Sequence, residues 1–166
     1  MRRNNPQPGD QWHPLIFYMV AVIILVADQL SKTAIRSLLD PGQSIPETGF
    51  IRFTHVQNTG AAFGIFYGYT FILSIFSLIG ISIMLYYAFY LHKRYPLLNS
   101  KLGAMVLGLV MGGTTGNLVD RLRLGYVTDF IDIGPWPMFN IADSCINVGI
   151  IIFAFILLIS IRAEKI

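Results

Sequence analysis

The chain has 166 residues, of which 54% are hydrophobic and only 13% are charged, and its mean hydropathy is +0.61. This balance excludes intrinsic disorder and argues against a soluble domain, in which about a quarter of the residues are charged. The net charge of +3 gives no indication of nucleic-acid binding, so the basic residues are better interpreted as markers of membrane topology. The length fits a single membrane domain, 1–166, and the lone Cys145 excludes an internal disulfide and a multi-cysteine metal site.

Four apolar stretches predict four transmembrane helices, at about 14–35, 69–91, 102–120 and 141–161. Each is close to the roughly 17–25 residues that cross a bilayer as a helix, and each is too long for a strand of a membrane barrel. We expect the first stretch to be retained rather than removed as a signal peptide, because it lacks a small-residue cleavage site.

The distribution of lysine and arginine favours a topology with both termini inside. The inner segments would then carry Arg2, Arg3, Lys93, Arg94, Lys101, Arg162 and Lys165. The outer segments would carry Lys32, Arg36, Arg52, Arg121 and Arg123. The bias is modest, but the connection from His92 to Lys101 is short and basic, as an inner loop should be.

Two longer segments, 36–68 and 121–140, would connect the spans on the outer side. The first contains a strand-like run from Phe50 to Val56, preceded by turn signals such as Pro41-Gly42. The second contains Gly134-Pro-Trp-Pro, which is typical of a rigid turn.

This topology brings many polar residues to one membrane face, where span one ends, span three ends and span four begins. Five of the nine acidic residues gather there, namely Asp28, Asp120, Asp129, Asp132 and Asp143. Neutral and basic partners at the same face are Asn58, Asn117, Asn140 and Arg121. A charge inside the bilayer costs about 2.5–3.5 kcal/mol even on lenient scales, so this accumulation predicts a functional site.

Several of these residues also have structural interpretations. Asp28 and Lys32 are four residues apart on a helix and can simply pair. For Asp120 and Arg121 we favour an interfacial ion pair that fixes the end of span three. Along span three, glycines at intervals of four residues favour close helix packing; they are Gly108, Gly112 and Gly116.

The residues around span four also allow two interpretations. Asn140 can cap the helix, with Asp143 in its first turn, where the helix dipole favours a negative charge. Asp132 is best interpreted as a solvated loop charge, whereas Asp129 is not.

Two aspartates held close together cannot both ionise readily and therefore share a proton. One then acts as a base and the other as an acid, which suits hydrolysis of an amide by an activated water. We expect no metal and no cofactor, because the spaced His and Glu ligands of metal sites are absent. The residues alone leave two alternatives open, a small proton-coupled transporter and a non-catalytic scaffold subunit.

Five motifs in this sequence resemble, in order and spacing, those of the lipoprotein signal peptidases (signal peptidase II). They are Asp28-Gln-Leu-Ser-Lys32, Asn58-Thr-Gly-Ala-Ala-Phe63, Gly112-Gly-Thr-Thr-Gly-Asn-Leu-Val-Asp-Arg121, Thr128-Asp-Phe130 and Phe139-Asn-Ile-Ala-Asp143. Each motif is weak alone, but the series covers about residues 14–161 and is specific. The implied fold is an all-α membrane protein of four transmembrane helices, with a small extracytoplasmic β-sheet and a short extracytoplasmic helix.

The resemblance implies an aspartic endopeptidase of the bacterial inner membrane that removes the signal peptide from diacylglyceryl-modified prolipoproteins, cutting before the lipidated cysteine. The implied catalytic residues are Asp129 and Asp143. The implied supporting residues are Asp28, Lys32, Asn58, Gly60, Asn117, Asp120, Arg121 and Asn140. The expected partners are the lipidated prolipoprotein and membrane lipid, without nucleic acid, and the expected enzyme is a monomer with cytoplasmic termini and its site at the outer face.

Overall fold

The structure is a computed structural model that describes residues 12–60, 68–93 and 98–163. Four of the basic residues used to predict the orientation lie outside the described residues, namely Arg2, Arg3, Arg94 and Lys165. Residues 61–63 of the second motif also lie outside them.

Four helices are long and apolar enough to cross a membrane, which confirms the predicted number of spans. They are α1 (Pro14–Leu38), α2 (Thr70–Tyr86, continued by the π-helical turn η2, Tyr87–Leu91), α3 (Lys101–Leu124) and α4 (Ile141–Ala163). Helix α3 continues beyond the predicted end of span three, at about residue 120, so Arg121 lies on the helix. The helix ends instead at Gly125, whose φ of 80° is a left-handed conformation that glycine adopts without a steric penalty.

Helix α3 forms the centre of the bundle and packs against the other three helices. In its apolar window 56% of the residues are buried, against 17%, 11% and 6% for α1, α2 and α4. A Cβ at Gly108 would lie 2.8 Å from the carbonyl oxygen of Phe17, and one at Gly112 would lie 2.6 Å from that of Ala21. The glycines therefore allow α1 to approach the α3 backbone closely, which confirms the predicted packing role of this ridge.

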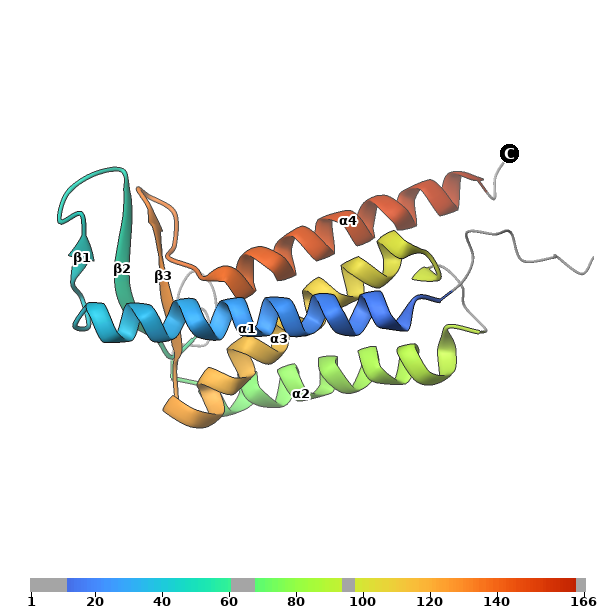
Figure 1. Cartoon of the computed structure of the whole chain (residues 1–166), viewed down its shortest axis with the longest axis horizontal. Coiled ribbons are helices and arrows are strands. Elements are labelled where there is room, and N and C mark those ends of the chain that lie inside the picture. Colours follow the sequence, from blue (N-terminus) through green and yellow to red (C-terminus); the bar gives the residue numbers. More distant parts are fainter. Residues whose placement is uncertain (1–11, 61–67, 94–97, 164–166) are drawn as a thin grey trace, which may run out of the picture.

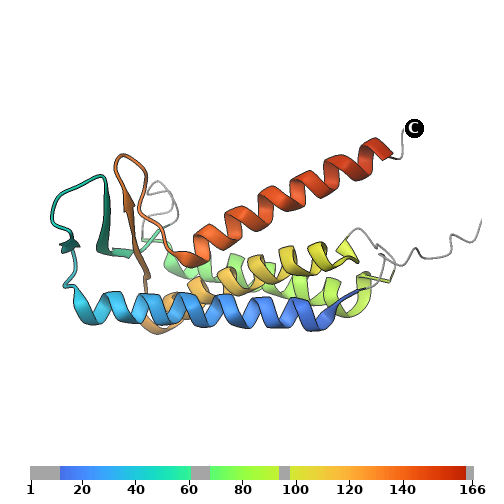
Figure 2. The same cartoon turned by 45° about the horizontal axis from the view of Figure 1, so that its top comes forward.

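The four helices run along the long axis of the molecule, with the sheet at one end (Figure 1). The start of α1 and the end of α4 both lie at the end of the bundle opposite the sheet (Figure 1). Figure 2 shows that α4 starts beside the other helices and diverges from them towards its C-terminal end. The first turns of α4 are therefore the part that meets the rest of the polar residues.

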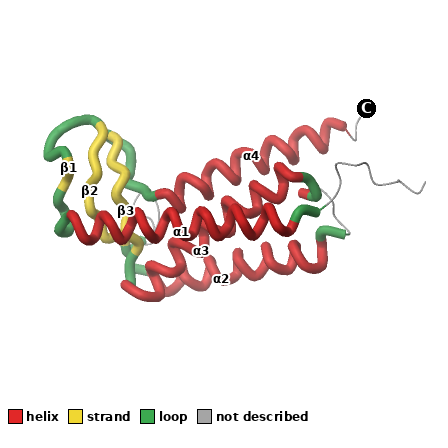
Figure 3. The backbone as a smooth tube through the Cα atoms, in the orientation of Figure 1, coloured by secondary structure: helices red, strands yellow, loops and turns green. Residues whose placement is uncertain are grey.

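The sheet consists of three antiparallel strands in the order β1-β2-β3 and lies at one end of the bundle (Figure 3). The strands are β1 (Ser44–Ile45), β2 (Ile51–Asn58) and β3 (Val127–Ile133), so the strand predicted from Phe50 to Val56 is confirmed. The expected short extracytoplasmic helix is not found in the described residues of the two outer segments. Val56 pairs with Asp129, and Asn58 at the end of β2 pairs with Val127 at the start of β3.

Candidate active site

Asp129 and Asp143 come from different elements that meet where the sheet joins the helices. Asp129 lies in β3 and is only 2% exposed, and Asp143 lies in the first turn of α4. Asn140 links the two residues. Its Nδ2 donates a hydrogen bond to Oδ1 of Asp129 at 2.7 Å, and its Oδ1 accepts one from the backbone N of Asp143 at 2.9 Å. We call Asp129 and Asp143 the candidate dyad.

Asn140 also caps helix α4. Its backbone N donates to Oδ2 of Asp143 at 3.3 Å, so Asn140 and Asp143 exchange hydrogen bonds as in a capping box. The two interpretations of this pair from the sequence are therefore compatible, because the same contacts that cap the helix also fix the Asp143 carboxylate.

Asn58 contacts the second carboxylate oxygen of Asp129. The backbone N of Gly60 donates to Oδ1 of Asn58 at 2.8 Å, which leaves the amide nitrogen facing Asp129. This Nδ2 donates to Oδ2 of Asp129 at 2.8 Å. Both carboxylate oxygens of Asp129 thus accept hydrogen bonds from amide groups.

Asn117 orients the carboxylate of Asp143 in the same way, by donating a hydrogen bond to it. The ammonium group of Lys32, which can only donate, lies 2.7 Å from Oδ1 of Asn117. The amide nitrogen of Asn117 must therefore point the other way, and it donates to Oδ1 of Asp143 at 2.7 Å. Lys32 does not contact the dyad itself but determines which end of Asn117 does.

A second set of charges lies behind the dyad, and we call Asp28, Lys32, Arg36 and Asp120 the anchor cluster. Lys32 is fully buried and pairs with Asp28 at 2.9 Å and with Asp120 at 3.5 Å. Arg36 lies 3.6 Å from Asp120. The predicted pairing of Asp28 with Lys32 is confirmed, and each acid of the cluster has at least one cation beside it.

The two acids of the anchor cluster hold the backbone next to each dyad residue. Oδ1 of Asp28 accepts a hydrogen bond from the backbone N of Ala142 at 3.0 Å. Oδ2 of Asp120 accepts one from the backbone N of Thr128 at 2.9 Å. Because Ala142 precedes Asp143 and Thr128 precedes Asp129, the anchor cluster fixes where both dyad carboxylates lie.

The predicted ion pair between Asp120 and Arg121 was wrong. Asp120 pairs with Lys32 and Arg36 instead, since neighbouring residues on a helix point in different directions. Arg121 makes no ion pair with a described residue and lines the cavity beside the dyad.

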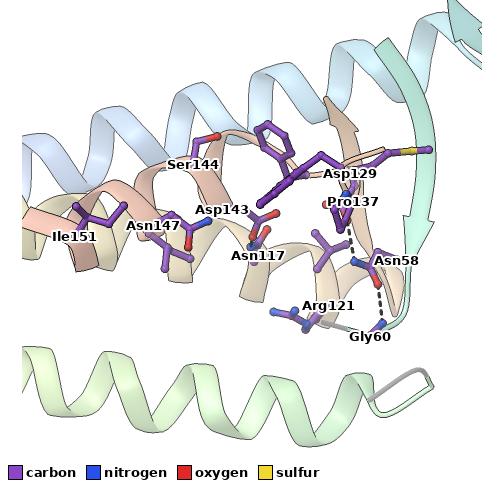
Figure 4. A pocket seen from close by; sticks show the side chains of 15 residues that line it. Asn58, Gly60, Asn117, Arg121, Asp129, Pro137, Asp143, Ser144, Asn147 and Ile151 are labelled. Atoms are coloured by element: carbon purple, nitrogen blue, oxygen red, sulfur yellow. Dashed lines mark hydrogen bonds between the residues drawn. The ribbon is translucent and has the colours of Figure 1, made fainter. Parts of the chain in front are cut away.

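A cavity of about 540 Å³ opens beside the dyad (Figure 4). Its polar wall includes both dyad residues together with Asn58, Asn117 and Arg121, and its apolar wall includes residues 136–139. A second cavity of about 510 Å³ also borders Asp143 and runs along the gap between α2 and α3. Of these two cavities, Asp129 therefore borders the first only, whereas Asp143 borders both.

Burial and the nearby Asp143 raise the pKa of Asp129 to about 7, although hydrogen bonds from Asn58 and Asn140 oppose this shift. Asp129 can therefore hold a proton near neutral pH. Among the described residues, no group of three or more His, Cys, Asp or Glu side chains could hold a metal ion. The arrangement suits acid–base chemistry on a polar bond.

Some contacts are not evident from the sequence. Gln29 donates to Asp120 at 3.3 Å and to the carbonyl oxygen of Gly116 at 3.0 Å, which ties α1 to α3. The interpretation of Asp132 as a solvated charge was wrong, because this residue is only 1% exposed and pairs with Arg52 at 2.6 Å. The direct pairing of Arg52 with Asp132 across β2 and β3 would have indicated this contact, had the register been known.

Comparison with known proteins identifies the family. The family model for signal peptidase (SPase) II matches residues 20–159. A lipoprotein signal peptidase from Dehalococcoides mccartyi strain 195 is 51% identical over 137 residues, which cover 82% of this chain and 85% of that protein. A lipoprotein signal peptidase from Moorella thermoacetica is 43% identical over 145 residues, covering 86% of this chain and 93% of that protein.

The fold agrees with this relationship. A solved bacterial membrane enzyme is 28% identical and superposes with a TM-score of 0.80, covering 96% of this chain and 97% of that chain. A second bacterial membrane enzyme is 27% identical, with a TM-score of 0.73 and coverage of 93% and 97%. This chain, a multi-pass membrane protein, therefore belongs to the signal peptidase II family of proteases.

Proposed function

We propose that this protein is an aspartic endopeptidase that removes the signal peptide from diacylglyceryl-modified prolipoproteins, cutting before the lipidated cysteine. The substrate class is supported by the names of the relatives, which are lipoprotein signal peptidases. The aspartic mechanism rests on one observation. Asp129 and Asp143 lie on one cavity and accept hydrogen bonds from amide groups, and neither has a cation within ion-pair distance among the described residues.

In the proposed reaction Asp129 holds the proton and Asp143 is ionised. The raised pKa of Asp129, about 7, supports this assignment. Asp143 takes a proton from a water molecule, and the water oxygen attacks the carbonyl carbon of the scissile amide. Asp129 donates its proton to the carbonyl oxygen, which gives a neutral tetrahedral diol. The carbon–nitrogen bond then breaks, with Asp143 giving its proton to the leaving amine and Asp129 regaining one from the diol.

Three further residues have proposed roles in this reaction. Asn58 and Asn117 orient the two carboxylates, and each is itself oriented by a neighbouring donor, Gly60 or Lys32. Arg121, which makes no ion pair with a described residue, would bind a substrate carbonyl on the cavity wall. Both dyad residues belong to one chain, so a monomer suffices.

The proposed topology places both termini in the cytoplasm and the dyad at the outer face of the bacterial inner membrane. It is supported by the common location of the start of α1 and the end of α4, away from the sheet (Figure 1). The apolar signal helix would lie beside the spans, and its acyl chains would remain in lipid.

Cleavage of a diacylglyceryl-modified prolipoprotein by the purified protein in detergent tests the proposal. We expect the wild type to release the signal peptide, seen as a shift on a gel, and Asp129→Asn and Asp143→Asn to release none while remaining folded. Normal turnover by either variant would remove that residue from the dyad. If the folded wild type released no peptide from a lipidated substrate, the proposed activity would be wrong, and proton flux in vesicles would test the transporter alternative.

A further inference from the structure

Asn147 is a polar residue in the lipid-facing part of α4 that the reaction described above does not use. It lies one helical turn after Asp143 and lines the same cavity (Figure 4). The surrounding helix is apolar, and only 6% of its window is buried inside the protein. An unpaired amide in contact with hydrocarbon is unfavourable, so a polar residue at this depth calls for a functional explanation.

The other asparagines around the dyad are already engaged. The side chains of Asn58, Asn117 and Asn140 all donate to a dyad carboxylate. Ser144, also on the cavity wall, donates to the backbone carbonyl of Asn140. The side chain of Asn147 is exposed and has no hydrogen-bond partner among the described residues. It therefore presents both an amide donor and an amide acceptor to whatever fills the cavity.

The substrate would bring groups of matching chemistry to this position. To reach the dyad, the last residues of a signal helix must unwind, because a helical backbone shields the scissile carbonyl from attack. Unwinding frees backbone N–H and C=O groups, which need hydrogen-bond partners at a position where the surrounding helix is apolar. An asparagine side chain can satisfy one group of each kind.

Helix and strand geometry give the register of this contact. Four residues along α4 correspond to about 6 Å, at about 1.5 Å per residue. An extended chain rises about 3.3 Å per residue, so Asn147 lies about two residues deeper than the scissile bond. Substrate residues before the cleavage site also lie deeper in the bilayer. The contact would thus fall near the third residue before the cut.

We propose that Asn147 is a substrate-binding residue that pairs through its side-chain amide with the backbone of the unwound signal peptide, at about the third residue before the cleavage site. This inference rests on the proposed function and adds a residue to it. Because the contact is to backbone atoms, it holds the peptide extended across the dyad and tolerates different side chains in the substrate.

The test combines Asn147→Leu with a change in the substrate. Leucine has a similar size but offers no hydrogen bond, and its packing against lipid should not lower the melting temperature. In a synthetic lipidated peptide, the N–H of the third residue before the cut is replaced by an ester oxygen. We expect kcat/KM to fall about tenfold for either change alone, with little further loss when both are combined, since both remove one contact. Val148→Leu is the matched control, because Val148 is also exposed but does not line the cavity.

The outcomes separate this inference from the proposed function. Normal kcat/KM for Asn147→Leu, or an equal loss from the ester in both proteins, would overturn the inference while wild-type cleavage upheld the peptidase activity. Absence of cleavage by the wild type would overturn both. If Asn147 contacts the lipid instead, replacing the ester-linked acyl chains by ether-linked chains would lower kcat/KM only in the wild type, and the backbone assignment would be wrong.

Discussion

The acids of the candidate dyad and those of the anchor cluster lie side by side but differ in their partners; all are buried except Asp143, which is half-buried. In the anchor cluster, Asp28 and Asp120 contact the ammonium of Lys32, at 2.9 and 3.5 Å. In the dyad, Asp129 and Asp143 accept hydrogen bonds from neutral amides only. Asp129 is as buried as Asp28 and Asp120, so burial alone does not separate the two sets, whereas the charge of their partners does.

The two sets are connected through Asn117, which accepts from Lys32 and donates to Asp143. A charge-compensated acid keeps a fixed protonation state and can act as an anchor for the backbone. An acid that accepts hydrogen bonds only from amides can exchange a proton more readily, since no cation lies within ion-pair distance to hold it in the ionised form. The comparison therefore predicts that substitutions in one set affect stability and those in the other affect chemistry.

The largest expected effect comes from replacing one acid of each set by asparagine, in two separate variants. Asp143→Asn removes the proton acceptor and should lower kcat by about a thousandfold or more, within the usual range for loss of acid–base catalysis of about 10²–10⁴. Its melting temperature should change little, because the amide oxygen still accepts from Asn117. Asp28→Asn should do the opposite, lowering the melting temperature while a measurable fraction of activity remains. Parallel assays of thermal unfolding and cleavage check this, and a reversed pattern would invalidate the comparison.

Removal of the shared cation should cause the largest loss of stability. Lys32→Met leaves Asp28 and Asp120 without a buried cation, and breaking a buried ion pair in this way costs about 3–5 kcal/mol. We expect a large fall in melting temperature in detergent. The double variant Lys32→Met/Asp28→Asn should recover part of this loss, because it removes one of the uncompensated charges. An unchanged melting temperature in the single variant would show that the cluster does not stabilise the fold.

A smaller and purely structural effect is expected at Asp120. Asp120→Asn keeps an oxygen for the backbone N of Thr128 but loses the attraction to Lys32 and Arg36. We expect a loss of about 1–3 kcal/mol in the free energy of unfolding. The folded fraction of the variant should still cleave the substrate. Asp40→Asn is the control, since Asp40 is exposed in the loop after α1. A folded, fully stable variant without activity would assign Asp120 to the chemistry instead.

The sequence predicts the spans and the location of the polar face well, because both depend on local properties. The length of an apolar run decides whether it can cross a bilayer, and the order of the spans decides which ends meet. The gathering of Asp28, Asn117, Asn140 and both dyad residues follows from that topology alone. Their assignment to catalysis or support came from the resemblance and stays a prediction.

The partners of individual charges could not be predicted, because they depend on contacts between elements. Asp120 pairs with Arg36, on a different helix, rather than with its neighbour in sequence. Asp132 pairs with Arg52 because the two residues are opposite each other in β3 and β2. This register could not be read from the sequence, since it shifts at a bulge between Phe53 and Val56. The extension of α3 to Leu124 depends on Gly125, whose left-handed conformation was not recognised as the helix end.

The smallest expected effect is a shift in the pH dependence of cleavage. If Asp129 must be protonated, activity should fall as the pH rises through the pKa of this residue, about 7. The hydrogen bond from Asn58 stabilises the ionised form and lowers this pKa, so Asn58→Ala should move the basic limb of the profile to higher pH. A hydrogen bond to a charged group contributes about 1.5 kcal/mol or more, which corresponds to a shift of about one pH unit.

The position of this limb separates a change in the proton affinity of Asp129 from a general loss of activity. Asn58→Ala is expected to lower kcat as well, because Asp129 loses one of the donors that orient it. A loss of orientation alone would reduce the rate equally at every pH and leave the limb in place. Gln57→Ala serves as the control, since Gln57 is exposed on the same strand. A limb that stays in place, or moves to lower pH, would mean that Asp129 is not the group whose proton the reaction requires, and the proton would then belong to Asp143.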